Sequence, residues 1–434
     1  MPENTSIENL YSIFLQHPVI CTDTRKLSPG CLFFALKGEN FNGNKFALQA
    51  IQTGAAYAIV DEEAGDNERL LYVNDVLTAL QQLATQHRRQ FSIPVIAIAG
   101  SNGKTTTKEL MAAVLNTQFK TLYTQGNLNN HIGVPLTLLS LNKTHEWAVI
   151  EIGANHQGEN ALLCDITEPD SGLVTNVGKD HLEGFGGIEG VKKASKEVYD
   201  YLKANKKTVF IQSGNSELME LMGKYDKVMA YGNATDSIAS GTASVTNGFL
   251  VVHLEKPFVA TIQTQLAGTY NLENVLAAVA VGNSAGVHSG NIIRGIENYQ
   301  PGNQRSQVMK IDQLTVLLDA YNANPSSMEA ALKNYDDAYP SPRRIALGEM
   351  LELGDAEAEE HMLIAEIAAN NKANEVLLVG KLFKEAAIKF GAHYFNTSEE
   401  AAVWLKTQLP LKGSLLVKGS RGTKMEKILE AFQA

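Results

Sequence analysis

Short, mainly apolar runs separated by helical patterns recur along the middle of the chain. The first begins directly after Pro94, where residues 95–99 contain no polar side chain. Similar runs follow at residues 147–152, 172–177, 208–211 and 227–231. A run without polar alternation is typical of a strand that is buried on both faces of a parallel sheet. Since helical segments such as residues 110–115 lie between several runs, the pattern predicts βαβ units and a mainly parallel sheet.

The first 85 residues carry a shorter version of this pattern. Turn-rich segments there separate three apolar runs, at residues 31–36, 56–60 and 70–73. This predicts a small α/β unit, whose strand order the pattern does not specify.

The chain after Pro301-Gly302 repeats the alternation of strand and helix. Its apolar runs lie at residues 314–318, 344–347, 376–379 and 414–417, and its helical patterns include residues 328–336 and 357–369. We expect a further α/β layer here, without the G-x-G-x-x-G sequence of a dinucleotide site. The acidic run at residues 354–360 is typical of a solvated helix start.

Residues 240–265 break the rhythm of the middle region. Val, Leu, Phe and Thr alternate there around Asn247-Gly248, which predicts a hairpin insertion. Taken together, the patterns predict an α/β protein of three domains, at residues 1–85, 86–302 and 303–434.

Composition narrows the class of protein. The 434 residues suggest two to four domains at roughly 100–200 residues each, and the net charge of −10 disfavours binding to a nucleic-acid backbone. The sequence shows no apolar stretch long enough to span a membrane and no features of a secretion signal. Cys21, Cys31 and Cys164 form no metal-binding spacing and fit a reducing compartment. We expect a cytoplasmic protein, most simply a monomer.

The strongest local signal directly follows residues 95–99 and leads into a helical pattern. It reads Gly100-Ser101-Asn102-Gly103-Lys104-Thr105-Thr106. In such a loop small residues let backbone N–H groups approach phosphate oxygens, and the helix N-terminus adds a favourable partial charge. Lys104 can then reach the terminal phosphates, and the Thr105 hydroxyl can coordinate Mg²⁺. Ile98 replaces the first glycine of the usual G-x-x-x-x-G-K-[ST] pattern, so this is the shorter G-x-x-G-K-T form.

Two further strand ends carry candidate metal ligands. Glu151 ends an apolar run, and a buried carboxylate is costly unless it is paired or bound to a metal. It is therefore either a Mg²⁺ ligand or an ion-pair partner. His181 follows the next run and is a second candidate ligand or a phosphate donor, although a loop histidine is more often simply solvated. Ligands gather at the carboxyl ends of strands in open parallel sheets, which favours the metal interpretation.

Several segments together resemble the Mur ligase family. They are GSNGKTTTKE, GNLNNHIGVPLTLL, EIGANHQGE, DHLEGFG, DAYNANPSSM, LGEMLELG and VKGSRGTKME, with DTR and GCLFFALKG near the N-terminus. The resemblance covers nearly the whole chain. G-K-T alone is common, whereas DAYNANPSSM joined to LGEMLELG is specific to one branch of the family.

The resemblance implies a three-domain fold and a reaction. The domains would be an N-terminal domain that binds the UDP end of the substrate, a central ATP-binding domain and a C-terminal Rossmann-like domain. The reaction would be ATP- and Mg²⁺-dependent ligation of D-alanyl-D-alanine to UDP-N-acetylmuramoyl-tripeptide through an acyl phosphate, for peptidoglycan synthesis. A ligase of the same fold that adds another amino acid and a non-enzymatic nucleotide-binding module are the alternatives.

The resemblance also implies roles for individual residues, carried over by position. Lys104, Glu151 and His181 would be catalytic, with Thr105, Glu151 and His181 as metal ligands. Nucleotide contacts beyond the loop would come from Asn271, Asn274, Arg305 and Asp319. The UDP-linked substrate would contact Thr24, Arg25, Asn127, Asn129 and Asn130, with Tyr321, Asn322 and Asn324 near the reacting groups. For Asn271 and Asn274, the residues alone favour helix capping and packing.

One position departs from the family pattern. The family often carries a carbamoylated lysine on the helix after the DHLEGFG segment, and Ser195 stands there in this chain. The neighbouring Lys196 lies about 100° further around a helix. Either Lys196 takes over through a local shift, or water and Ser195 replace the bridge to the metal.

Overall fold

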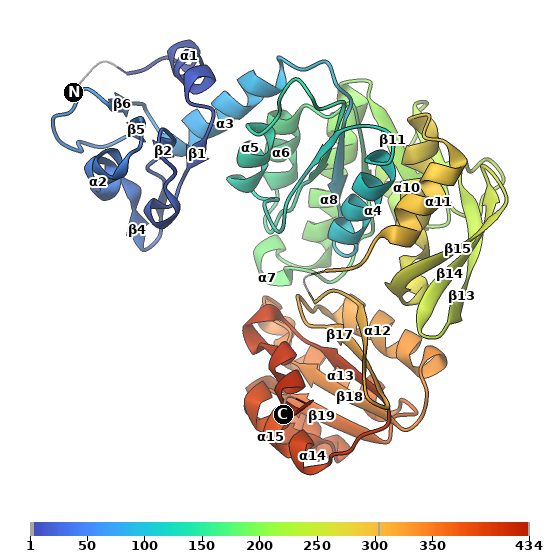
Figure 1. The fold of residues 1–434 in the computed structure, drawn as a ribbon. Helices are drawn as coiled ribbons and strands as arrows, with labels where there is room; N and C mark the ends of the chain where they lie inside the picture. The colour runs from blue at the N-terminus through green and yellow to red at the C-terminus, as the bar shows by residue number, and fades with distance from the viewer. Residues whose placement is uncertain (1–3, 303, 433–434) are drawn as a thin grey trace. The chain divides into compact units, whose positions relative to one another are not determined.

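A computed structural model describes residues 4–302 and 304–432 of the chain (Figure 1). It divides into two compact units. One consists of the chain up to Ala97 with Phe119–Ala154 and Gly158–Ser171, and the other of Ile98–Gln118, Asn155–Gln157 and the chain from Gly172 onward. Residue 303, at the start of the third predicted domain, lies outside the described residues. None of the described helices is both long and apolar enough to cross a membrane.

The N-terminal region of the chain is built around a four-stranded parallel sheet in the order β1-β2-β5-β6. Its strands are β1 (Ile20–Cys21), β2 (Leu32–Phe34), β5 (Tyr57–Val60) and β6 (Leu70–Tyr72), with a small ribbon of β3 (Lys37–Gly38) and β4 (Phe41–Asn42). Its helices are α1 (Ile7–Gln16), α2 (Ala47–Thr53) and α3 (Val76–Arg88). All three predicted strands are present, because their apolar side chains form the core of this sheet.

The central sheet has six strands in the order β12-β11-β10-β7-β9-β8. They are β7 (Val95–Ala99), β8 (Thr121–Tyr123), β9 (Trp147–Glu151), β10 (Ser171–Val174), β11 (Thr208–Gln212) and β12 (Val228–Tyr231). The intervening helices are α4 (Lys104–Leu115), α5 (Gly133–Leu138), α6 (Glu159–Thr167), α7 (Leu182–Phe185), α8 (Ile188–Ala204) and α9 (Ser216–Met222). The sequence pattern predicts all of these strands except β8. It extends β10 three residues too far, because the chain after Val174 turns to hold the loop that follows β7.

The predicted hairpin is present and is part of a three-stranded antiparallel sheet (Figure 1). The strands are β13 (Ser240–Thr246), β14 (Phe249–Lys256) and β15 (Ala260–Ala267). Asn247 and Gly248 both have positive φ, which matches the tight turn that two-residue hairpins favour. The helices α10 (Leu272–Ser284) and α11 (Ser289–Asn298) follow, with α10 entered through the short helix η3 (Thr269–Asn271).

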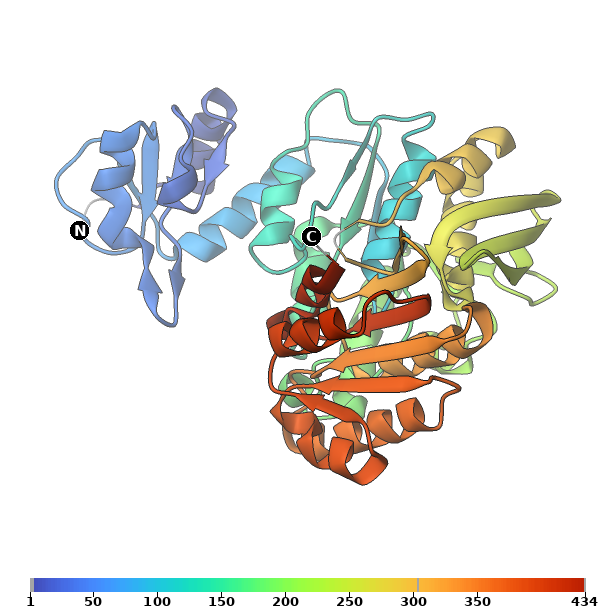
Figure 2. The same ribbon diagram turned by 60° about the horizontal axis from the view of Figure 1, so that its bottom comes forward.

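The C-terminal sheet has the order β16-β17-β21-β18-β19-β20, and only β16 runs antiparallel to its neighbour (Figure 2). Its strands are β16 (Gln307–Ile311), β17 (Leu314–Asp319), β18 (Arg343–Gly348), β19 (Glu375–Val379), β20 (His393–Phe395) and β21 (Gly413–Lys418). Its α-helices are α12 (Pro325–Ala338), α13 (Glu357–Ala369), α14 (Lys384–Phe390) and α15 (Ser398–Thr407). Short 3₁₀ segments are η4 (Gly354–Ala356), η5 (Lys381–Phe383), η6 (Arg421–Thr423) and η7 (Met425–Phe432).

Both faces of the C-terminal sheet are covered. Leu317, Ile345 and Leu416 pack in one apolar cluster, whereas the adjacent residues Leu318 and Ala346 pack in another. Since successive side chains of a strand point to opposite faces, the two clusters lie on opposite sides of the sheet. This explains why the strands read as continuous apolar runs, and it confirms the α/β class.

Candidate active site

The loop after β7 depends on two glycines. Gly100 has φ of +119°, and a Cβ there would come within 2.3 Å of the Thr175 Oγ1 atom. Gly103 has φ of +80°, and its Cβ would lie 2.8 Å from Oδ1 of Asn274. Glycine is therefore needed at both positions, for the backbone conformation and for the close approach of neighbouring atoms.

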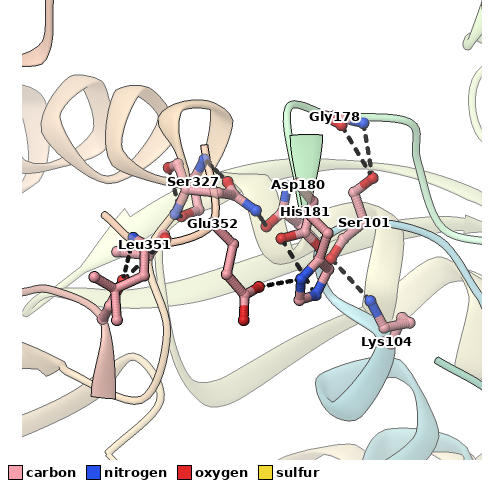
Figure 3. Close-up of polar contacts among 12 residues, drawn as sticks. Ser101, Lys104, Gly178, Asp180, His181, Ser327, Leu351 and Glu352 are labelled. Carbon is pink, nitrogen blue, oxygen red and sulfur yellow. Dashed lines mark hydrogen bonds and ion pairs between the residues drawn. The ribbon is translucent and has the colours of Figure 1, made fainter. Parts of the chain in front are cut away.

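The helix α4 begins at Lys104 with its first-turn N–H groups directed at the loop. The cap residue of α4 is Gly103, which has no side chain to accept a hydrogen bond from the N–H groups of the first turn. Such a helix start binds anions through its N–H groups and its positive partial charge. The Lys104 ammonium folds back and donates to the carbonyl oxygens of Gly100 and Ser101, the latter at 3.0 Å (Figure 3). Thr105 is buried and Thr106 is half-buried in the same turn.

The segment that follows β10 is hydrogen-bonded to this loop. The Asn176 side chain accepts from the Asn102 N–H at 3.0 Å and donates to the Asn102 carbonyl at 2.9 Å. The Ser101 N–H donates to the Asn176 carbonyl at 3.0 Å, and the Ser101 hydroxyl contacts both backbone groups of Gly178 (Figure 3). The sequence analysis missed Asn176, because its only signal was a polar residue at the end of an apolar run.

Asn271 and Asn274 are buried and join α10 to the loop helix. The Thr107 hydroxyl donates to Oδ1 of Asn274 at 3.0 Å, Asn274 donates to Oδ1 of Asn271 at 2.8 Å, and Asn271 donates to the Ala267 carbonyl at 2.7 Å. Through these hydrogen bonds the two asparagines have the packing role that the sequence pattern favours for them. They also place Asn274 directly against Gly103.

Glu151, at the end of β9, is held by the segment after β8. Its carboxylate accepts from the Asn129 amide at 2.8 Å, and its backbone N–H donates to the Thr124 hydroxyl at 2.9 Å. The carboxylate is nearly inaccessible, since Glu151 is 2% exposed. The structure therefore brings Asn129 and Glu151 together. Asn130 instead accepts from two N–H groups at the start of α5, and Asn127 is exposed.

His181 lies at the start of α7 with φ of +47°. Its Nδ1 atom contacts the Glu352 carboxylate, and its Nε2 atom lies 3.8 Å from Oδ1 of Asp180 (Figure 3). Glu352 comes from the segment after β18, and the sequence analysis gave it no role. In residues 4–302 and 304–432, no group of three or more His, Cys, Asp and Glu side chains has the arrangement of a metal site.

Asp319, at the end of β17, is bound from two sides. Its Oδ2 atom accepts from the Lys418 ammonium at 2.5 Å, and its Oδ1 atom accepts from the Ser306 N–H at 3.2 Å. Lys418 also donates to the carbonyl oxygen of Asn322 at 3.4 Å, and its side chain is only 2% exposed. The structure thus adds Lys418 to the predicted residues of this strand end.

Tyr321 lies between two guanidinium groups. Arg305 is 3.8 Å from the centre of the tyrosine ring, and Arg421 is 5.3 Å from it. Such cation–π contacts keep both cations close to the ring face. Arg305, predicted for the nucleotide, and Tyr321, predicted for the reacting groups, therefore lie together, and Arg421 was not predicted.

Asn324 connects the start of α12 with the loop after β7, residues 100–103, which we call the phosphate loop. Its Oδ1 atom accepts from the Ser327 N–H at 2.9 Å, which caps the helix, and its amide donates to Oδ1 of Asn102 at 2.9 Å. Close by, the Ser326 hydroxyl accepts from the Lys179 N–H, and the Lys179 ammonium pairs with Glu360 at 2.5 Å. Glu360 is buried, so the prediction of a fully solvated acidic run is wrong at this residue.

Thr24 and Arg25 lie in the 3₁₀ turn η1 (Thr24–Lys26) of the N-terminal sheet. The Arg25 guanidinium makes two bonds to the Asp23 carboxylate, at 2.9 and 2.8 Å. These bonds lower the pKa of Asp23 from 3.8 to about 2. The Arg25 side chain is 87% exposed, so the paired guanidinium faces solvent.

Ser195 and Lys196 point in different directions from α8. Ser195 is buried, whereas Lys196 is exposed and its ammonium contacts the Asp200 carboxylate at 2.6 Å, one helical turn further on. Lys196 therefore lies on the solvated face of the helix. We do not assign it a carbamate.

Known proteins match this chain along most of its length. A model described as "Mur ligase family, catalytic domain" matches residues 18–88, "Mur ligase middle domain" matches residues 98–282, and "Mur ligase, glutamate ligase domain" matches residues 304–421.

Two relatives and one solved structure illustrate the similarity. The UDP-N-acetylmuramoyl-tripeptide–D-alanyl-D-alanine ligases of Bacillus subtilis and Escherichia coli are 34% and 37% identical to this chain. Each alignment covers 95% of this chain, with 92% of the first relative and 93% of the second. A crystal structure of MurF from Acinetobacter baumannii is 33% identical and superposes with a TM-score of 0.87. That match covers 96% of this chain and 93% of the other.

Proposed function

We infer the function from a premise that the three matched models and the relatives establish: this chain belongs to the Mur ligase family and has its three-domain α/β fold. We propose that it uses ATP to join D-alanyl-D-alanine to UDP-N-acetylmuramoyl-tripeptide. The product is the UDP-linked muramoyl pentapeptide, a precursor of peptidoglycan. The relatives that carry this activity in their names align over nearly their whole length.

One structural observation favours this reaction over that of a ligase that adds another amino acid. The phosphate loop with Lys104 at the start of α4 contacts the segment DAYNANPSSM through the bond between Asn102 and Asn324. That segment, joined to LGEMLELG, is specific to the branch of the family that adds the dipeptide. A nucleotide-binding loop and a branch-specific segment therefore meet at one place.

The chemistry requires an activated carboxylate. The γ-phosphoryl group of ATP moves to the terminal carboxylate of the tripeptide, giving an acyl phosphate and ADP. The dipeptide amine then attacks the carbonyl carbon, loses a proton, and the bond to the phosphate oxygen breaks. Lys104 and the N–H groups of α4 bind the phosphates and offset the repulsion between the two anions, which lowers the barrier to transfer.

The predicted metal ligands suit Mg²⁺. Thr105 and Glu151 offer a hydroxyl and a carboxylate, which are hard oxygen donors, and both residues are buried. Mg²⁺ usually keeps several waters and takes few protein ligands, so a dense cluster of carboxylates is not needed. We propose Thr105, Glu151 and His181 as the ligands. When bound, the ion would neutralise charge on the transferring phosphoryl group.

The remaining assignments follow from the same proposal. Asn271, Asn274, Arg305 and Asp319 would contact the nucleotide, and Tyr321, Asn322 and Asn324 would lie near the reacting groups. Thr24, Arg25, Asn127, Asn129 and Asn130 would contact the UDP-linked substrate. We propose the domain limits 1–85, 86–302 and 303–434, and a monomeric protein that acts in the cytoplasm.

A ligase assay with alternative acceptors tests the proposal. Phosphate release and product mass would be measured with ATP, Mg²⁺ and the UDP-linked tripeptide carrying either lysine or diaminopimelate. D-alanyl-D-alanine should support turnover with at least one tripeptide, whereas glutamate, lysine and diaminopimelate as acceptors should not. Turnover with a single amino acid but not with the dipeptide would identify another ligase of this fold.

A further inference from the structure

The segment between β18 and η4, residues 349–353, is held by several hydrogen bonds to other elements, including those that Glu349 accepts from the N–H groups of Leu382 and Ser420; we refer to it as the 349–353 loop. The Met350 N–H donates to Nε2 of His361 at 3.0 Å, and the Leu351 N–H donates to the Ser420 hydroxyl at 3.2 Å. The Glu352 carbonyl accepts from the Glu183 N–H at 3.3 Å. These bonds connect the loop to α13, to the end of β21 and to α7.

The bond to Met350 specifies the tautomer of His361. A backbone N–H can only donate, so Nε2 of His361 must be the acceptor and carries no proton. The proton therefore lies on Nδ1, which donates to the Glu357 carbonyl at 2.6 Å. His361 is fully buried, and the Phe383 ring packs against it edge-on. Burial lowers its pKa and so favours the neutral form, while the nearby carboxylates of Glu349, Glu357 and Glu360 act in the opposite direction.

The loop carries Glu352 to His181. The Glu352 carboxylate lies against Nδ1 of His181 as a close charge contact without the geometry of a hydrogen bond, which leaves Nε2 as the ring nitrogen on the other side (Figure 3). A carboxylate beside one ring nitrogen favours one orientation of an imidazole, and so influences what the second nitrogen can bind. Asp180 is 3.8 Å from Nε2, beyond hydrogen-bonding distance, so Glu352 is the stronger of the two constraints.

We propose that His361 is a positioning residue: it holds the 349–353 loop so that Glu352 orients the imidazole of His181. The inference rests on the proposed function for the role of His181 in catalysis. The connection itself runs from α13 through the loop to the start of α7, and it can be measured in the resting protein. This role gives a reason why the fully buried His361 accepts a hydrogen bond from the Met350 N–H of the loop.

The test combines a spectroscopic and a kinetic measurement. Histidine ring resonances would be recorded on the full chain with labelled histidine, with His181 assigned by its loss in His181→Asn. Glu352→Ala and His361→Phe should both shift the His181 resonance. His361→Gln should leave it in place, because the glutamine amide oxygen can accept from the Met350 N–H. His288→Gln, at an exposed histidine outside the site, is the matched control.

The kinetics should follow the same pattern. Loss of a partner that orients a metal-binding histidine reduces activity about 10–100-fold, so kcat should fall by this order in Glu352→Ala and His361→Phe. The double variant should be no slower than Glu352→Ala alone, since both changes remove one connection. His361→Gln should retain most of the activity.

Two results would overturn the proposal. One is an unmoved His181 resonance in Glu352→Ala or in folded His361→Phe, and the other is a double variant whose losses multiply. Should His361→Phe not fold, His361→Asn replaces it, because its shorter amide cannot reach Met350, and the same outcomes apply. A protein that shows the resonance shifts but ligates no dipeptide would contradict the proposed function and leave the positioning role intact.

Discussion

We assign Lys104 to the phosphates of the nucleotide. Its ammonium donates to the carbonyl oxygens of Gly100 and Ser101 in the structure. Phosphate oxygens carry negative charge and are therefore stronger acceptors than these neutral carbonyl oxygens. The Lys104→Ala variant should therefore lose on the order of 10²–10³-fold in kcat, as when a donor to a developing anion is removed. Binding of the UDP-linked tripeptide, measured by calorimetry, should be unchanged, because we assign that substrate to other residues.

The matched control is Lys389→Ala, which removes an amine from α14, where the ammonium lies over the ring of the neighbouring Phe390. It should behave as wild type. If Lys104→Ala weakened binding of the UDP-linked substrate as strongly as it slowed turnover, the assignment of Lys104 to the nucleotide would be wrong.

His361 also predicts a dependence of stability on pH. Burial lowers the pKa of this imidazole in the folded protein below its usual 6.5, so the unfolded chain binds a proton first as the pH falls. The stability linked to the neutral form is fully present above pH 6.5 and decreases as the pH falls toward the lowered pKa. The melting temperature of the wild type should fall between pH 7.5 and 5.5, about the range over which histidine titrates.

His361→Gln isolates this effect, since the amide does not titrate. Its melting temperature should fall less over the same pH range, measured by thermal unfolding in matched buffers. Identical pH dependence in the two proteins would show that His361 is not the titrating group.

Charged residues in short motifs could be predicted from sequence, but the residues that hold them could not. Lys104 and Glu151 follow apolar runs, so their chemistry and their place in the fold can be read together. Asn176 and Lys418 act through the backbone of Asn102 and the carboxylate of Asp319, far away in the chain. Such partners depend on tertiary packing, which periodicity does not describe.

The turn between β7 and α4 has little room for substitution. In Gly100→Ala the added Cβ would meet Thr175 and Asn176 within 2.9 Å, at a φ that alanine rarely adopts. We expect a loss of about 1–3 kcal/mol in the free energy of unfolding, the usual cost of overpacking, together with weaker nucleotide binding. Chemical denaturation and nucleotide titration would measure both.

Gly290→Ala provides the comparison, because nothing lies within 4 Å of the added atom. Glycine in a helix costs roughly 0.5–1 kcal/mol relative to alanine, so this variant should be as stable as wild type or slightly more so. An equal loss in both variants would mean that the contacts at Gly100 are not the cause.

A comparison of two helix caps distinguishes an effect on stability from an effect on function. Asn324 caps α12 and also contacts Asn102, whereas Asn215 caps α9 by the same kind of bond and lies outside the site. Asn324→Ala and Asn215→Ala should each lose about 1 kcal/mol of stability, the typical value of a cap. Only Asn324→Ala should raise KM for ATP or lower kcat. Equal kinetics in both variants would contradict a role for the contact between Asn324 and Asn102.

The inner strands were all predicted, whereas several edge strands were missed. The central strands β7, β17 and β21 are buried on both faces and read as continuous apolar runs. The missed strands include β1, β8, β16 and β20, which lie at the edge of their sheets. An edge strand needs fewer apolar residues because one side meets no neighbouring strand, so sequences such as Gln307–Ile311 carry little signal.

At the scale of the whole molecule, the predicted domains each carry a mainly parallel sheet with its own strand order. The family models match three consecutive stretches of the chain in the same order. The class of fold and the family could therefore be predicted from sequence. The pairing of the 349–353 loop with α13 and α7 could not, since it joins segments that share no local pattern.

The central claim is that ATP activates the terminal carboxylate of the tripeptide by phosphorylation. The most direct test places oxygen-18 in that carboxylate and follows the label by mass spectrometry during turnover with D-alanyl-D-alanine. The account predicts that one labelled oxygen leaves in each inorganic phosphate, because the bond that breaks lies between the carbonyl carbon and that oxygen. Phosphate that contains no label while the pentapeptide forms would contradict it.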